Sequence, residues 1–544
     1  MAQVPAPAAQ QLLRQQERER ALREQQEAKR DVRLQGAEVI APGRIPGDES
    51  PCFYIQTFRL GGEGAGQFRW ALDAIDQADD PATGRCLGTA GVNTVMKRVQ
   101  NAIIARGFVT TRVLATPQDL KGGTLTLTVV PGRIRAIRFA DGTQPRATLW
   151  SAVPAEPGDL LNLRDIEQGL ENFKRVPTVE ADIQIVPAEG ERAQPGESDL
   201  VIAWRQSRHV RVGLSLDDAG SESTGKVQAG ATLSLDHLLR ANDLFYVNFG
   251  HDAFNGGGQG TQSWSAHYDV PWGYWLAGVT ASAYDYHQAV AGPYQTYLYS
   301  GSSGNAEVRL ARLLFRNAHA KFGGYARAWA RESKNYIDDT EVEVQRRRTA
   351  GWEVGLTHRH FFGSATLDAN VAYQHGTGAF GALAAPEEAF GEGTSRMKVI
   401  TADAQLAVPF PLGNQRLRYT GSWRAQWNRT PLVPQDRFAI GGRYTVRGFD
   451  GEVSLAGERG WLVRNDLGLM LGGGQELYVA ADYGHVGGPS TQGQLGDHLA
   501  GAVVGLRGGW TGGYWDLFVC APIDKPGGFP TAYTTTGFNL VWSF

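Results

Sequence analysis

The chain has 544 residues, with 53 Lys and Arg against 56 Asp and Glu, so its formal net charge is −3. This balance excludes a generally basic nucleic-acid-binding protein, and a hydrophobic fraction of 42% is too high for wholesale disorder. The sequence contains no apolar run of about 18 residues, so no transmembrane helix is expected. The 69 glycines, the 10% aromatic residues and the low charged fraction of 20% favour a large, mainly β protein with many turns.

The first ten residues, MAQVPAPAAQ, contain neither a charged n-region nor an apolar h-region, so they do not resemble a signal peptide. The sequence therefore represents either a cytosolic protein or a mature form from which a leader has been removed. Residues 11–30 follow and contain no Gly, Pro or β-branched residue, which predicts a helix. This helix has no continuous apolar stripe, so it must lie in water or in a polar cavity. It is either a frayed tail or a mobile plug inside an aqueous pore, and its residues include Leu12, Leu13, Arg18 and Leu22.

Residues 31–50 contain two prolines and several glycines, which predicts a linker. The next segment, residues 51–131 (the first module), has the pattern of a small β-α-α-β-β domain. Its expected elements are a strand at 53–60, a helix at 66–78, a helix from Val92 to a terminal Gly107, and strands at 109–116 and 124–130.

Residues 132–207 (the second module) repeat this order in part, with one helix evident rather than two. Strands are expected at 133–140, 179–188 and 198–205. Asn162 and Asp165 have the spacing of a capping box in front of an amphipathic helix. The shared layout at a period of about 80 residues indicates a tandem duplication.

From about residue 209 to the end, apolar and polar residues alternate strictly. In the first strand Val210, Val212, Leu214 and Leu216 share one face. Alternation of this kind is typical of a transmembrane barrel with lipid outside and water inside, although a soluble sandwich would show it with the apolar face turned inward. The length of the region favours the barrel, and so does its aromatic final strand, GFNLVWSF. At roughly 21 residues per strand and connection, the region accommodates 16 strands.

Several segments resemble one known family. PCFYIQTFRL (51–60) and CLGTAGVNTVMKRVQNAIIARGFVTTRVLATPQDLKGGTLTLTVVPGRI (86–134) resemble the first POTRA domain of two-partner secretion transporters. GGRYTVRGFDGE (441–452) is similar to the inward-folding loop of that superfamily, and its VRGF motif consists of Val446, Arg447, Gly448 and Phe449. YVAADYG (478–484) resembles the strand that carries the partner of this loop: Asp482 and Gly484 match the family pattern, whereas Ala480 departs from it.

The resemblance implies a mainly β fold: a 16-stranded transmembrane antiparallel β-barrel preceded by two small α/β POTRA domains and an N-terminal polar helix. The expected divisions are a plug helix at 1–30, a linker at 31–50, POTRA domains at 51–131 and 132–207, and a barrel at 208–544 whose inward loop spans about 437–460.

The function implied is that of an outer-membrane translocator with its POTRA domains in the periplasm. It would bind an unfolded partner exoprotein by strand addition and export it through a water-filled lumen. The pattern is closer to hemolysin and contact-inhibition transporters than to filamentous-adhesin transporters. The implied partners are a large secreted exoprotein and the lipid bilayer, without nucleic acid. We expect a monomer with no enzymatic activity and no cofactor.

Three other functions remain as alternatives. A barrel-assembly insertase of the same superfamily usually carries more POTRA modules. A diffusion porin needs no periplasmic modules, and a TonB-dependent receptor needs a globular plug and a larger barrel. A soluble β enzyme is a further possibility, but no HExxH motif or P-loop is present.

Two expectations concern individual contacts. In ELYVAADYG the alternation directs Asp482 and Gly484 into the lumen, where Arg447 can form a two-bond fork with the Asp482 carboxylate. Gly448, which has no Cβ, allows close approach of the loop to the wall. We also expect one disulfide, Cys52–Cys86, because the periplasm is oxidising, and Cys520 would remain a free thiol.

Two further groups resemble metal ligands. His358 and His360 lie on one face of a strand, but such a pair is more typical of lumen or loop side chains. Asp338, Asp339, Glu341 and Glu343 form an acidic run that we expect to be a solvated extracellular loop. No metal site is predicted.

Overall fold

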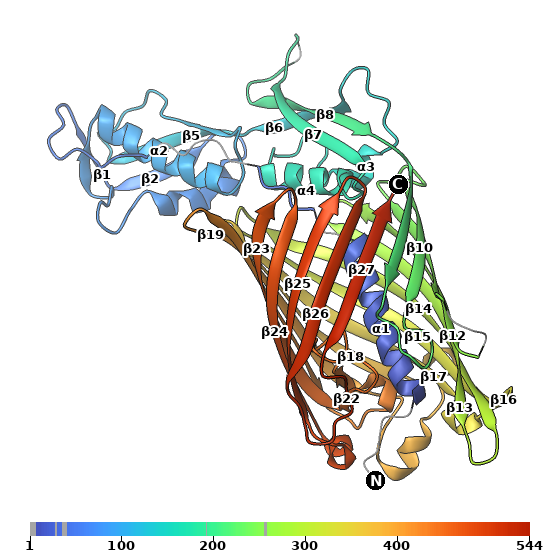
Figure 1. Ribbon diagram of the computed structural model, residues 1–544. Helices are drawn as coiled ribbons and strands as arrows, with labels where there is room; N and C mark the ends of the chain where they lie inside the picture. The colour runs from blue at the N-terminus through green and yellow to red at the C-terminus, as the bar shows by residue number, and fades with distance from the viewer. Residues whose placement is uncertain (1–6, 28–29, 35–40, 192, 255–257) are drawn as a thin grey trace.

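The computed structural model describes residues 7–27, 30–34, 41–191, 193–254 and 258–544. It consists of a tall β-barrel with the two modules at one end, here called the module end, and a helix, α1 (Pro7–Gln26), inside the barrel (Figure 1). The helix begins four residues earlier than expected, at a proline, which is favoured in the first helical turn because its missing N–H has no intrahelical partner there. Among the described residues, no helix combines the length and the apolar character needed to cross a membrane.

The first module has a three-stranded sheet of order β2-β5-β4, a separate β1-β3 pair and one long helix. The expected strand at 53–60 is interrupted at Gln56, because the N–H groups of Gln56 and Thr57 both donate to the Gly123 carbonyl, at 2.8 and 3.1 Å. The expected helix at 66–78 is wrong in type and length: a 3-10 helix ends at Ala74. The elements of the first module are β1 (Phe53–Ile55), β2 (Thr57–Gly61), η1 (Ala65–Ala74), β3 (Arg85–Leu87), α2 (Thr89–Ala105), β4 (Arg112–Leu114) and β5 (Thr124–Val130).

The second module has a sheet of order β6-β8-β7 covered by helices. It contains two helices rather than the one expected, since a four-residue helix is too short to give a periodic pattern. Asn162 caps the longer helix by accepting from the Arg164 N–H at 2.9 Å. The capping-box role of Asp165 is wrong, because its carboxylate accepts from the Tyr274 hydroxyl of the barrel instead. The elements are β6 (Arg133–Phe139), α3 (Leu149–Ala152), α4 (Leu163–Phe173), β7 (Val179–Pro187) and β8 (Glu197–Gln206).

In the described part of the chain, sixteen long antiparallel strands form a barrel that β27 and β9 close, which confirms the predicted fold class. A two-residue strand, β16 (Thr340–Glu341), extends the connection after β15. The long strands are β9 (Val210–Asp217), β10 (Gln228–Asp236), β11 (Leu244–Asp252), β12 (Gly260–Trp272), β13 (Trp275–Ala291), β14 (Thr296–Arg316), β15 (Ala320–Ile337), β17 (Arg347–Phe362), β18 (Ala365–Thr377), β19 (Lys398–Leu412), β20 (Gln415–Asn428), β23 (Arg459–Gly472), β24 (Gln475–Gly487), β25 (His498–Trp510), β26 (Gly513–Asp524) and β27 (Thr535–Ser543).

The connections at the other end of the barrel, the far end, carry short 3-10 helices and one small hairpin. They are η2 (Glu343–Gln345), η3 (Ala379–Gly381), η4 (Pro386–Phe390), η5 (Pro434–Asp436), η6 (Pro489–Gly493) and the hairpin strands β21 (Phe438–Ile440) and β22 (Leu455–Gly457).

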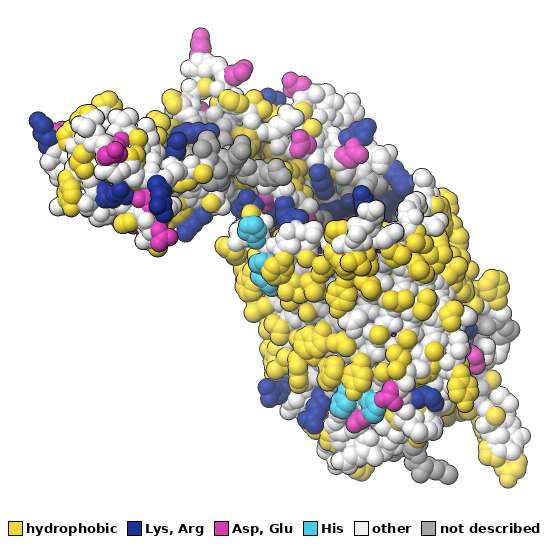
Figure 2. Space-filling view, turned by 60° about the vertical axis from the view of Figure 1, so that its left-hand side comes forward, with side chains coloured by type: hydrophobic (Ala, Val, Ile, Leu, Met, Phe, Trp, Pro, Cys, Tyr) yellow, Lys and Arg dark blue, Asp and Glu magenta, His cyan; other side chains and the backbone are white. Residues whose placement is uncertain are grey.

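The apolar face of the strands points outward. Val210 and Leu214 are 49% and 43% exposed, whereas Gln228 and Ser234, on the polar face of β10, are buried. Hydrophobic side chains form a broad belt over the visible outer face of the barrel (Figure 2). This is the arrangement of a membrane barrel and excludes the soluble sandwich, in which the apolar faces would pack inward.

Candidate functional site: the lumen, the inward loop and helix α1

The inward loop (residues 437–460) folds back against the barrel wall. Strands β21 and β22 pair with each other, and β21 lies against β23 and β24 of the wall. Apolar side chains of the loop and the wall share a buried cluster. Its members are Phe438, Ile440, Val446, Phe449, Leu455, Leu462, Val486, Leu499 and Phe529.

Arg447, in the VRGF motif, binds the wall through Asp482. Its Nε and Nη2 atoms donate to the two carboxylate oxygens of Asp482 at 2.7 and 2.8 Å, and its backbone N–H donates to the same carboxylate at 3.0 Å. Nη2 also donates to Asp466 of β23 at 2.5 Å. Since Arg447 is 8% and Asp482 2% exposed, these charge-assisted bonds are shielded from water and their geometry is well defined.

Two glycines allow the loop to approach the wall closely. Gly448 has a φ of +108°, and a Cβ there would lie 2.7 Å from the Ala521 carbonyl oxygen. Gly484, on the wall, lies under Val446, whose Cγ2 would be 2.7 Å from an added Cβ. Both glycines are therefore needed for contact between the loop and the wall.

The aromatic residue of the motif and the position that departs from the family pattern have separate surroundings. Phe449 packs edge-to-face on Phe529, with 5.8 Å between the ring centroids. Ala480 lies in a different buried cluster with Tyr478 and Cys520, and Cys520 is the free cysteine.

Helix α1 lies in the lumen and contacts the wall mainly through charged side chains. Arg18 pairs with Asp217 at 2.9 Å, and Arg23 pairs with Glu307 at 2.7 Å. Glu17 accepts two bonds from Arg424, at 2.5 and 2.7 Å. Leu12, Leu13 and Leu22 are only half-buried, and the described side chains that are buried are Ala8, Ala9 and Gln11.

The helix also touches the inward loop. The Gln10 side chain donates to the Glu452 carbonyl at 2.7 Å, and Arg14 donates to the Gly451 carbonyl at 2.5 Å. A cavity of about 530 Å³ extends between α1, the loop and the wall. The lumen is therefore partly filled rather than sealed.

Arg443 binds where β27 and β9 close the barrel, a contact that the sequence did not predict. Arg443 of the inward loop donates to the Phe538 carbonyl on β27 at 2.7 Å and pairs with Asp218, directly after β9. Asp218 also accepts from the Phe538 N–H at 3.0 Å. The one available signal was the position of Asp218 at the end of an alternating strand, which does not identify a partner 225 residues away.

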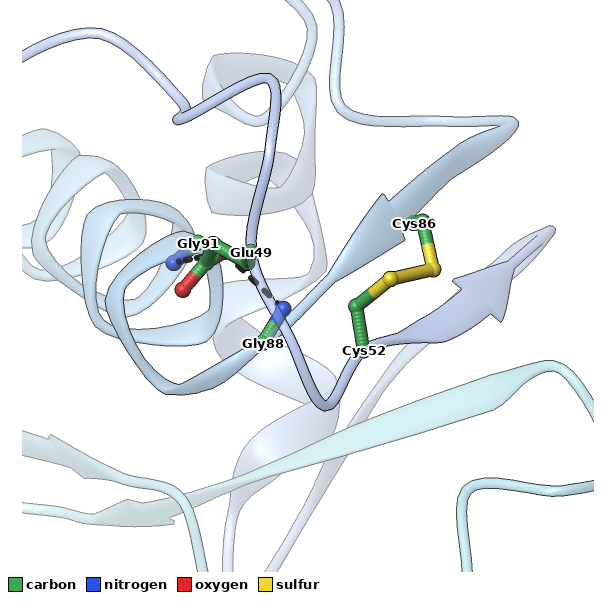
Figure 3. The surroundings of a disulfide bond; sticks show 5 residues. All are labelled: Glu49, Cys52, Cys86, Gly88 and Gly91. Atoms are coloured by element: carbon green, nitrogen blue, oxygen red, sulfur yellow. Dashed lines mark hydrogen bonds between the residues drawn. A yellow bond between two sulfur atoms is a disulfide. The ribbon is translucent and has the colours of Figure 1, made fainter.

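In the first module, Cys52 and Cys86 form a disulfide with a Cα–Cα distance of 5.3 Å. Beside it, Glu49 accepts from the N–H groups of Gly88 and Gly91 at 2.9 and 2.8 Å (Figure 3). It also accepts from the Ala90 N–H at 2.7 Å, so it caps the start of α2. Burial acts to raise the pKa of Glu49, but these three donors outweigh burial and lower it. Ile45 packs in the apolar core of the same module, so residues 45–49, expected as part of a linker, belong to the module.

Among the described residues, one group has the spacing of a metal site: Glu27, His267 and Asp269. Asp269, however, accepts from Arg175 of the second module at 2.8 Å, and His267 Nε2 lies 3.0 Å from Asp269. His267 Nδ1 contacts the Thr280 hydroxyl at 2.8 Å. The group is a polar junction between module, wall and helix.

The histidine pair was expected in the lumen or in a loop, and this expectation is wrong. His358 and His360 have the same parity on β17 as Leu356 and Phe362, which are 48% and 56% exposed, so both face outward. The His360 ring lies 4.2 Å from the Phe362 ring. The pair belongs to the aromatic outer surface near the module end.

The acidic run is paired locally. Asp338 accepts from the Leu298 N–H at 2.8 Å, and Glu341 pairs with Arg346 at 2.6 Å. These bonds organise the connection that follows β15.

The chain is similar to known proteins over most of its length. The family described as haemolysin secretion/activation protein ShlB/FhaC/HecB matches residues 196–508, a ShlB-type POTRA domain matches 53–132, and a further POTRA domain matches 133–187. The outer membrane transporter CdiB-2 of Burkholderia pseudomallei is 37% identical over 96% of this chain and 93% of its own length. The hemolysin transporter protein ShlB of Serratia marcescens is 22% identical over 74% of this chain and 71% of its own. The structure of CdiB from Acinetobacter baumannii superposes with a TM-score of 0.87 at 29% identity, with all of both chains covered.

Proposed function

Because the chain belongs to the haemolysin secretion/activation protein family ShlB/FhaC/HecB, we propose that it exports one large partner exoprotein across the outer membrane. The two modules lie in the periplasm, so the module end of the barrel is its periplasmic end and the far end is extracellular. The observation that carries the proposal is the filling of the lumen: a polar helix held by ion pairs lies beside a loop fixed by a buried cluster.

Capture of the client uses the edges of the module sheets. In the orders β2-β5-β4 and β6-β8-β7, the outer strands have one side without a partner in their sheet. An unfolded client has unpaired backbone groups, and pairing with such an edge satisfies both. Recognition of this kind is largely independent of client sequence, with side-chain contacts setting the register.

Passage requires α1 to leave the lumen. The arginines of its ion pairs remain partly open, with Arg18 and Arg23 at 22% and 32% exposure, whereas their partners Asp217 and Glu307 are 11% and 5% exposed. When the helix leaves, water solvates both partners of each pair, and this hydration offsets much of the lost attraction, so the helix can exchange its contacts for water. No nucleotide is available at the outer membrane, and folding of the client outside supplies the direction.

The similarity to the outer membrane transporter CdiB-2 and to the hemolysin transporter protein ShlB favours a contact-inhibition or hemolysin-type exoprotein as the client. The barrel closes within one chain and carries its own plug and loop, which supports a monomer in the lipid bilayer. The polar junctions described above are structural pairs, which supports a role in transport without catalysis or cofactor.

The test is co-expression with a large secreted exoprotein, which is to be sought in the reading frames next to the one for this chain. We expect the exoprotein in the medium in proportion to heat-modifiable barrel in the membrane. Accumulation of the exoprotein in the periplasm beside a normally inserted barrel would contradict the proposal. Defective insertion of other barrels on depletion would favour the insertase, and uptake of small solutes without export would favour the porin.

A further inference from the structure

Residues 31–34, here called the strap, lie in a groove between α4 of the second module and the periplasmic rim of the barrel. The Val32 N–H donates to Glu171 at 2.8 Å, and the Leu34 N–H donates to Glu167 at 2.9 Å. Both glutamates belong to α4 and both amides belong to one extended segment, so the helix binds the strap through its backbone.

The spacing of the two acceptors fits an extended chain. Glu167 and Glu171 are four residues apart on a helix, which separates them by about 6 Å along the axis. Every second residue of an extended chain repeats after about 6.6 Å. The two carboxylates therefore match alternate amides of any extended segment, whatever its sequence.

The groove is built from charged groups, of which Glu167 and Arg316 are buried and Glu171 and Lys321 are half-buried. Arg316, 8% exposed, donates to Glu167 at 3.0 Å and to Glu171 at 2.9 Å, which orients both carboxylates. Arg316 also donates to the Val32 carbonyl at 2.5 Å, so both the N–H and the carbonyl of Val32 are bound. Lys321 adds a bond of 2.6 Å to Glu171.

Successive side chains of the strap contact the second module and the barrel in turn. Val32 and Leu34 pack against the apolar core of the second module. Asp31 pairs with Lys321 at 2.8 Å and with Arg359 at 2.7 Å. The Arg33 guanidinium lies 4.4 Å from the centroid of the Phe361 ring.

The position of the groove suggests its use. Its barrel residues come from the periplasmic ends of β14, β15 and β17, at the mouth through which a client must enter. We propose that the groove binds an extended segment of the exported exoprotein with alternating apolar and charged residues, and that the strap occupies it as a stand-in until export. This proposal rests on the proposed function.

Displacement of the strap would act on the plug. The strap begins five residues after Gln26, the end of α1, so a client segment that replaces it removes the periplasmic attachment of the helix. The strap is tethered, which gives it an effective concentration in the millimolar range. A client bound to the modules is tethered too, so it can compete where a free peptide cannot.

The first test measures peptide binding to the full-length protein in detergent. The probe is a dye-labelled peptide with the sequence of residues 30–36, RDVRLQG. The protein carries Val32→Pro and Leu34→Pro, which remove the two N–H donors of the strap but allow an extended backbone. We expect saturable binding by fluorescence anisotropy, at least tenfold tighter than to the unmodified protein.

Two modified peptides provide the control. N-methylation of the amides equivalent to Val32 and Leu34 should abolish binding, whereas N-methylation of the intervening Arg33 amide, which points away from α4 in an extended chain, should preserve it. Equal binding of all three peptides, or no binding to the double-proline variant, would overturn the proposal.

The second test asks whether the client uses the groove. The photo-crosslinking residue p-benzoylphenylalanine replaces Phe361, and the exoprotein is stalled in the pore by a folded domain at its C-terminus. Crosslinks should form to the strap at rest and to the exoprotein during export. The same residue at Phe362, which faces outward, should form neither. Crosslinks to the strap alone, while part of the stalled exoprotein is exposed at the cell surface, would overturn the proposal. Failure of export itself is detected separately, as absence from the medium of an exoprotein that lacks the folded domain.

Discussion

The inward loop and helix α1 both occupy the lumen, but they are attached by different physics. The loop buries apolar side chains such as Val446 and Phe449 and forms a shielded ionic fork to the wall. The helix makes ion pairs in which at least one side chain remains partly exposed. Two segments that fill the same space therefore differ in whether they can leave it.

The magnitudes support this distinction. Burial of one large apolar side chain contributes about 1.5–3 kcal/mol, and the loop shares a cluster of them with the wall. The ion pairs of the helix contribute less on balance, because water solvates both partners when the helix leaves. We therefore expect the loop to remain part of the pore wall and the helix to act as a removable plug.

Breaking the fork should have the largest effect. Arg447→Ala removes both guanidinium bonds from the buried Asp482, and Asp482→Ala leaves the buried Arg447 with Asp466 as its acidic partner. Removing one partner of a buried pair costs about 3–5 kcal/mol, and we expect the remaining bond to Asp466 to reduce this cost in Asp482→Ala. We expect each substitution to lower export sharply with the barrel still inserted. Arg447→Lys should also fail, because an ammonium cannot form the fork. The measurement is exoprotein in the medium relative to heat-modifiable barrel; normal export from both alanine variants would refute a role for the contact.

Removing the plug should have a different result. Deletion of residues 7–26 should raise single-channel conductance in planar bilayers several-fold and leave export largely intact, because the ion pairs of α1 are not part of the wall. Glu17→Gln, which weakens the pair with Arg424, should give briefer and rarer openings than the deletion. Unchanged conductance after the deletion would show that α1 does not limit the pore.

A smaller effect should distinguish the two reasons for a glycine in the loop, which are close approach to the wall and a positive φ. Gly448→Ala places a Cβ 2.7 Å from a carbonyl oxygen at a φ of +108°, whereas Gly451, with a φ of +78°, has its nearest atom at 4.0 Å. Gly448→Ala and Gly451→Ala both place an alanine at a positive φ, which destabilises the fold, but only Gly448→Ala should also displace the loop. We expect the unfolding midpoint on heating to fall further for Gly448→Ala, by several degrees; equal midpoints would contradict the need for close approach.

Alternation in the sequence predicted much of this site, since a period of two places Asp482 and Gly484 on the lumen side of β24 once the outer face is known. The second acid at Arg447, Asp466, depends on the register of β23 against β24, which pairs Arg464 with Asp482. No local pattern determines that register. The same parity, extended along β17 from Leu356, would have placed His358 and His360 outside. Contacts across long separations, such as Glu49 with α2, left no trace in the sequence.

The second module is attached to the barrel in a third way, through a carboxyl group whose neutral, protonated form is favoured by burial. Asp165 on α4 accepts from the Tyr274 hydroxyl in the turn between β12 and β13. Burial raises the pKa of Asp165 from 3.8 to about 6, so the folded state binds the proton more tightly than the unfolded state. The resulting stability is complete below pH 3.8 and is lost as the pH rises through about 6.

We therefore expect the protein to be more stable at pH 5 than at pH 7.5 by about 1 kcal/mol. Linkage contributes about 1.4 kcal/mol for the one pH unit between pH 5 and the pKa of about 6, and the partial exposure of the side chain reduces this value. Asp165→Asn, which is neutral at both pH values, should raise stability at pH 7.5 and remove most of this pH dependence. Asp182→Asn, at an exposed site on β7, is the matched control and should leave the slope unchanged. Chemical unfolding monitored by a fluorophore on the second module provides the measurement. An unaltered slope in Asp165→Asn would show that the module is attached to the barrel independently of this proton.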